Sequence, residues 1–89
     1  MDNLNNQEIS EPIGEVVNYF AHVKAAAIKV FGDLMPGDRI RIKGGEKDFE
    51  QEVKSIEINR KKIDKAQAGD EVGILVEQDV GKGYKIYKA

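Results

Sequence analysis

Residues 38–43 read DRIRIK, and this stretch decides the fold. Its two isoleucines alternate with basic side chains, a period of two that places one face in a core and the other in solvent. The preceding residues, MPGD at 35–38, favour a turn because proline presets φ and glycine accepts a positive φ. Gly44-Gly45 ends the pattern on the other side. The stretch therefore predicts a half-buried β-strand between two turns.

The same period-two pattern recurs on both sides of this strand. Further strands are predicted over residues 13–20, 23–30, 49–59, 72–76 and 84–88. Within 49–59 the apolar residues change face near Lys54-Ser55, which predicts a bulge or bend of the kind that barrel corners need. Short strands without a long helix predict an all-β fold, a small closed antiparallel β-barrel of about six or seven strands.

The three alanines at 25–27 leave a second possibility open, because alanine is the best helix former. They are too few to sustain a helix, and β-branched residues flank them. We therefore expect a strand here.

Length and composition allow one domain. The chain has 89 residues and a formal net charge of −2. It has no Cys, and this absence excludes disulfides and thiolate metal sites. Residues 1–11 are polar and acidic, so they predict a disordered, flexible tail, with the barrel over 12–89. No apolar run approaches the roughly 18 residues of a membrane span, and no signal peptide begins the chain. We expect a cytoplasmic protein without membrane contact.

No catalytic constellation stands out. His22 is the single histidine, and a lone histidine is more often an ordinary strand-end residue than a base. Asp48, Glu50 and Glu52 alternate along one predicted strand, where they are more often solubilising charges than acid–base or Mg²⁺ groups. The glycines at 32–37 lack the Lys-Ser/Thr pair of a phosphate loop. We expect no enzyme activity, no catalytic or metal-binding residues, no cofactor and no nucleotide binding.

Two basic clusters are candidates for binding. One lines the outer face of the predicted strand at Arg39, Arg41 and Lys43; the other surrounds a predicted turn. The members of this second cluster are Arg60, Lys61, Lys62 and Lys65. Phosphate contacts need such residues, but acidic neighbours dilute both clusters. A plain solvated surface and an RNA- or ribosome-facing surface both stay open.

Two stretches carry a resemblance to known families. Residues 34–42 read LMPGDRIRI, and residues 56–76 read IEINRKKIDKAQAGDEVGILV. Together they resemble the second, β-barrel domain of elongation-factor-Tu-type translational GTPases, and small stand-alone translation elongation factor-like proteins. The chain also resembles the C-terminal module of collagenase-like peptidases, which carries a similar Gly-Asp hairpin and a Tyr-Lys-like ending, here Tyr87-Lys88.

The elongation-factor resemblance implies a non-catalytic binding module in translation, which would contact tRNA, rRNA, the ribosome or a translation-related protein. It implies a partner-binding role for Arg60 and Glu57, with Glu71 in place of a family asparagine. Lys61, Lys62 and Lys65 would add attraction for phosphate. The peptidase resemblance implies the alternative, a protein-interaction domain that serves as the detached accessory module of a separately encoded enzyme.

Overall fold

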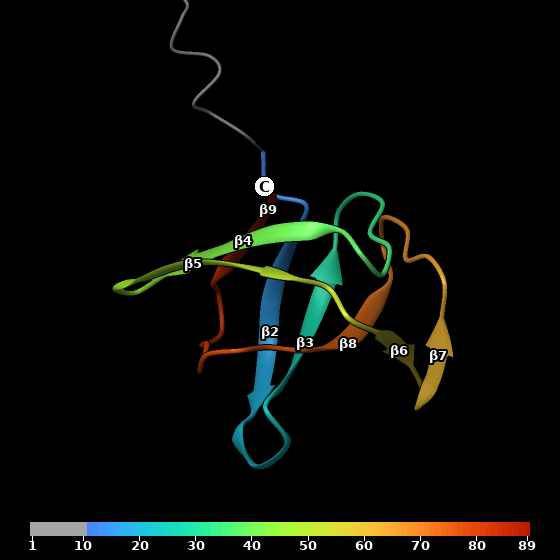
Figure 1. Ribbon diagram of the computed structural model, residues 1–89, viewed down its shortest axis with the longest axis horizontal. Helices are drawn as coiled ribbons and strands as arrows, with labels where there is room; N and C mark the ends of the chain where they lie inside the picture. The colour runs from blue at the N-terminus through green and yellow to red at the C-terminus, as the bar shows by residue number, and fades with distance from the viewer. Residues whose placement is uncertain (1–10) are drawn as a thin grey trace, which may run out of the picture.

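The computed structural model describes residues 11–89, which form an all-β fold as the sequence predicts (Figure 1). The strands are β2 (Gly14–Phe20), β3 (Ala25–Val30), β4 (Arg39–Gly44), β5 (Lys47–Glu52), β6 (Ile56–Ile58), β7 (Lys61–Ile63), β8 (Glu71–Leu75) and β9 (Lys85–Lys88). One turn of 3-10 helix, η2 (Ala21–Val23), links β2 to β3, so the strand prediction for the alanines is confirmed. The predicted tail, apart from its last residue, lies outside the described residues.

The eight strands form one antiparallel sheet in the order β5-β4-β9-β2-β3-β8-β6-β7. Its edge strands, β5 and β7, do not pair with each other, so the sheet is not closed and the prediction of a closed barrel is wrong. The physical reason lies at residues 53–55, where the chain leaves one ladder and enters another. Before these residues β5 pairs with β4, and after them β6 pairs with β8 and β7. The strand predicted over 49–59 is therefore two strands, and the buried positions change face between Val53 and Ile56, as predicted near Lys54-Ser55.

One buried polar side chain ties the edge strand β5 to the end of β8. Gln51 in β5 is only 2% exposed. Its amide nitrogen donates to the backbone carbonyl of Leu75 at 2.9 Å, and its amide oxygen accepts from the backbone N–H of Glu77 at 2.8 Å. A side chain rather than a ladder therefore ties β5 to the end of β8, and both ends of the buried amide are satisfied.

The core lies between the two halves of the curled sheet. In Figure 1 the β4–β5 hairpin crosses over β2 and β3, and the aliphatic side chains between these layers are removed from solvent. The largest fully buried ones include Ile28, Leu34, Ile40, Ile42, Ile56 and Ile86. In β4 both isoleucines are buried and the basic residues between them are exposed, which confirms the alternation predicted for residues 38–43.

Two turns share one construction. Residues 35–38 and 67–70 both end in Gly-Asp, with glycine φ values of 96° and 97°. In each, the aspartate carboxylate accepts a hydrogen bond from the backbone N–H three residues earlier, at 3.0 and 2.9 Å. A bridge between Leu34 and Ala66 joins the two turns. Both Gly-Asp motifs thus have a structural role: glycine supplies the positive φ, and aspartate satisfies a backbone donor.

Candidate functional site

A shallow groove crosses the outer face of the sheet along β3 and β8. Its floor consists of Ala25 and Ala27 on β3 and Gly73 on β8, and Ala27 and Gly73 are register partners. The residues that alternate with these, Ala26 and Ile74, are buried in the core, so the floor residues face outward. Two adjoining hollows of about 220 and 540 Å³ share this floor, and together they form what we call the β3–β8 groove.

Apolar side chains wall this groove. Phe20, Val23 and Leu75 line its hollows and are 42%, 52% and 50% exposed. Phe20 and Leu75 are the register partners of Ala25 on its two sides, so they flank a residue that has almost no side chain. Large apolar side chains gathered in one exposed place are typical of an interaction surface.

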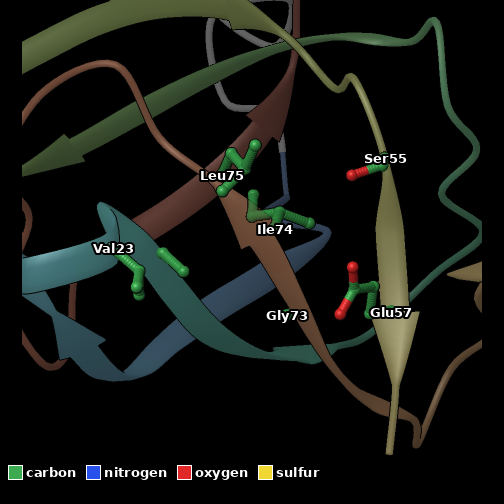
Figure 2. Close-up of a pocket in the computed structure, with 7 residues that line it drawn as sticks. Val23, Ser55, Glu57, Gly73, Ile74 and Leu75 are labelled. Carbon is green, nitrogen blue, oxygen red and sulfur yellow. The ribbon is translucent and has the colours of Figure 1, made fainter. Parts of the chain in front are cut away.

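Polar groups lie on the opposite wall, which β6 and the β6–β7 loop provide. Glu57 is the register partner of Gly73, and Figure 2 shows its carboxylate directed toward the strand that carries Gly73. Arg60 lines the larger hollow from the loop, and His22 lines it from η2. The groove therefore combines an apolar floor with one acidic and one basic side chain on the same wall.

The backbone of Arg60 adopts an unusual conformation. Asn59 and Arg60 form the two-residue loop between the partners Ile58 and Lys61, and their φ values are 53° and 67°. Two positive φ values are typical of a type I′ hairpin turn, whose second position usually takes glycine. A larger side chain there costs about 1 kcal/mol. Strain of this kind is concentrated at functional sites, which makes Arg60 a candidate for binding.

Replacing Arg60 by glycine should therefore raise the free energy of unfolding by about 1 kcal/mol. Urea denaturation followed by circular dichroism would measure the change. Lys61→Gly is the matched control: its position lies in β7, where glycine weakens a strand, so stability should fall. A lower stability of Arg60→Gly would show that the arginine side chain itself supports the fold.

The three lysines predicted for binding differ in their position relative to Arg60. Lys61 and Lys62 follow it on β7, where both are exposed. Lys65 lies beyond β7, and its Nζ forms an ion pair with Asp33 at 3.4 Å. The basic cluster of the sequence is therefore divided, with one arginine in the groove, two lysines beside it and the third lysine paired elsewhere.

The two predicted acidic residues are also separated. Glu57 lines the groove, and Lys62 is its register partner on β7. Glu71 is exposed at the start of β8 opposite Lys29, outside the groove lining.

Sequence reasoning missed the apolar part of the site. Three alanines within one strand and a glycine inside another were the available signals, because strands disfavour both residue types. Their meaning depends on the register between β3 and β8, which no local pattern contains.

The other basic cluster is neutralised by the neighbouring strand. Arg41 donates through Nε and Nη2 to the two carboxylate oxygens of Asp48, both at 2.7 Å, and Arg39 Nε approaches Glu50 at 3.4 Å. The hydrogen bonds from Arg41 hold the pKa of Asp48 below its ordinary value, so this carboxylate stays ionised. Arg39 and Arg41 with Glu50 and Asp48 thus form two exposed cross-strand ion pairs, which suit neither phosphate binding nor proton transfer.

Two further features of residues 11–89 bear on the chemistry. No three His, Asp or Glu side chains of this part of the chain gather so that they could hold a metal ion. None of its helices has the length and apolar character needed to cross a membrane.

Comparison with known proteins relates the chain to proteins described as peptidases. It is 38% identical over 76 residues to a Methanocaldococcus jannaschii protein named "uncharacterized protease". This match covers 84% of the chain but only 19% of that relative, so the chain spans about a fifth of its length. No protein-family model matches the chain.

Two solved structures share the fold, and both are of the C-terminal domain of a Geobacillus thermoleovorans protein described as a U32 peptidase. One superposes with a TM-score of 0.85 at 22% identity and covers 89% of this chain and 92% of that domain. Its selenomethionine variant gives 0.83 at 22% identity, over 88% of this chain and 99% of that domain.

These similarities correct the elongation-factor prediction. The matches fit the resemblance to the peptidase C-terminal module, whereas the assignment to translation and to elongation-factor domain II is wrong. The motifs behind that assignment include the two Gly-Asp turns, whose residues are explained by turn geometry and hydrogen bonding alone. Such turn motifs report how a chain folds and carry no information about what it binds.

Proposed function

We propose that this chain is a non-catalytic accessory domain that binds a protease-like protein. The observation that carries the proposal is the extent of the structural match, which takes in 92% of a domain that forms the C-terminal part of a described peptidase. The named protease relative is also much longer than the chain, which matches 19% of it. Both comparisons support a fold that works as one part of a larger proteolytic assembly.

The described surface is consistent with binding rather than catalysis. One concave feature of it, the β3–β8 groove, joins an exposed apolar wall to Arg60 and Glu57, while Asp48 is held by Arg41. Among the predicted partner-binding residues, we retain Arg60, Lys61, Lys62 and Glu57 at the centre of the site. Lys65, which is paired with Asp33, and Glu71 lie outside it.

Affinity purification of the full chain from native lysate, with and without RNase, tests this proposal. We expect a protease-like protein to be enriched, and RNase to leave its recovery unchanged. Recovery of RNA-bound particles alone, lost on RNase treatment, would contradict a protein partner and would make RNA the ligand.

The purified chain alone should release no peptides from fluorescently labelled casein or gelatin. The reason is that, within residues 11–89, the hydroxyl of Ser55 has no hydrogen bond to a base, and no three His, Asp or Glu side chains gather to hold a metal ion. A variant with Ser55→Ala, which removes the one serine hydroxyl of residues 11–89, is the control for any residual signal. Hydrolysis by the purified chain that this variant abolishes would refute the non-catalytic assignment.

A further inference from the structure

Gly73 has no side chain at a position where the fold would accept one. A Cβ at Gly14 would lie 3.1 Å from the backbone oxygen of Lys29, and one at Gly44 would collide with the ring of Tyr84. At Gly73 the nearest atom to an added Cβ is the backbone oxygen of Glu57 at 3.9 Å, an ordinary contact. Packing explains the first two strand glycines but leaves the third unexplained.

The unexplained glycine lies beside other departures from folding preference. Ala25 and Ala27 occupy outward strand positions next to it, although alanine is depleted in strands. Leu75 is half exposed, and Arg60 has a backbone conformation that favours glycine. When local rules fail together at one place, the usual reason is function. Here each departure either keeps the groove open or places a charged group at its edge.

Positive charges outnumber negative ones in and beside the groove. Arg60 lines it, and the exposed residues Lys24, Lys61 and Lys62 lie next to lining residues or follow Arg60 in sequence, against the single lining carboxylate of Glu57. Within residues 11–89, no ion pair of 4.0 Å or less joins any of these four cations to a carboxylate. Arg39 and Arg41 of β4, by contrast, are paired with Glu50 and Asp48 of β5. The groove and its neighbouring residues thus offer cationic charge to an incoming anionic group.

We propose that the β3–β8 groove binds an extended, acidic protein segment that carries an apolar anchor. The anchor side chain lies on Ala25 and Gly73 between the walls formed by Val23 and Leu75. A carboxylate of the segment pairs with Arg60, whose planar guanidinium can hold it with two hydrogen bonds. The inference rests on the proposed function only in taking this segment from the protease-like protein.

The composition of the groove favours a protein segment over a nucleic acid. Its floor is aliphatic, and Phe20 is the one Phe, Tyr or Trp among the lining residues described, so successive bases have no stacking platform. Glu57 lies on the same wall as Arg60. Its carboxylate can accept a backbone N–H from a bound protein segment, whereas a phosphate backbone has no donor to offer it.

Fluorescence polarisation with three labelled peptides tests the inference directly. The probe is Asp-Glu-Leu-Phe-Glu-Asp; one control replaces its acidic residues by lysine, and the other replaces Leu-Phe by Gly-Ser. We expect the probe to bind at least about tenfold more tightly than either control, and its affinity to fall with added salt. Oligouridine serves as the nucleic-acid competitor.

Gly73→Val separates binding from folding. Valine fills the floor and suits a strand, so this variant should keep or raise the melting temperature while weakening the probe about tenfold or more. Glu71→Val is the matched control, since it lies on the same strand and face but outside the groove lining. Its removal of a negative charge should leave binding unchanged or slightly tighter.

Arg60→Glu should weaken the probe about tenfold or more, whereas the equal charge change Lys54→Glu, at an exposed site away from the groove lining, should not. If Arg60→Glu fails to fold, Arg60→Gly tests the same contact without backbone strain. Any of four results would overturn the inference. These are equal binding of all three peptides, displacement of the probe by oligouridine, self-association of the chain through the groove, and undiminished binding of the probe by Gly73→Val.

The two proposals can fail separately. Selective peptide binding without recovery of a protease-like protein from lysate would leave the groove assigned and remove the proposed function. Recovery of that protein by Gly73→Val as efficiently as by the native chain would keep the function and place docking elsewhere.

Discussion

Gln51→Glu should lower the free energy of unfolding by about 3–5 kcal/mol at neutral pH. The substitution preserves the shape of a 2%-exposed side chain but replaces its N–H donor by an oxygen. The backbone carbonyl of Leu75 then loses its hydrogen bond and faces a buried negative charge. Because small domains are only marginally stable, such a loss would unfold a large part of the sample.

The effect should depend on pH in a defined direction. Burial raises the folded-state pKa of the introduced carboxyl above its unfolded value of about 4.3. Below about pH 4 the group is protonated and can again donate to Leu75, so the destabilisation is small. It grows as the pH rises through the raised folded-state pKa. Urea denaturation between pH 4 and 8 would measure it, with Gln78→Glu at an exposed position as the control. A pH-independent loss would show that ionisation of the introduced carboxyl is not responsible.

Ile86→Ala should cost about 2–5 kcal/mol, because it opens a cavity at the centre of the sheet. Ile86 is fully buried on β9, whose neighbours are β4 and β2, and its register partners are Ile42 and Gly14. Thermal and urea denaturation would report the change. Leu75→Ala removes comparable bulk from a half-exposed wall and should cost under about 1 kcal/mol. Equal losses from the two variants would mean that the groove wall is as tightly packed as the core.

The strands could be predicted because their alternation is local. In residues 38–43 each isoleucine is followed by a cation, and the structure buries one set and exposes the other. Whether the sheet closes into a barrel could not be predicted from this alternation, because a period of two identifies the buried face of a strand but not the strand that pairs with it. Residues 61–63 illustrate the same limit. Two consecutive lysines suggest a solvated turn, yet they form edge strand β7, where charged side chains are well tolerated.

The candidate site was predicted only in its charged half. Arg60 and Glu57 come from the sequence resemblance, and both line the groove. The floor depends on Ala27 and Gly73 being partners across two strands that lie more than forty residues apart, and only the fold establishes that pairing. The Gly-Asp turns misled the assignment for a related reason: turn chemistry recurs wherever the backbone needs it, so it carries little information about a partner.

The pairing of β2 with β9 has a practical consequence for handling the molecule. Gly14 and Ile86 are partners, and Ile13 donates to the Ile86 carbonyl at 2.7 Å, so both ends of the described chain leave from one side (Figure 1). Phe20, at the far end of β2, marks the groove. A surface tether or a fluorescent reporter attached at the C-terminus would therefore lie at the end of β2 opposite to Phe20 and leave the groove accessible.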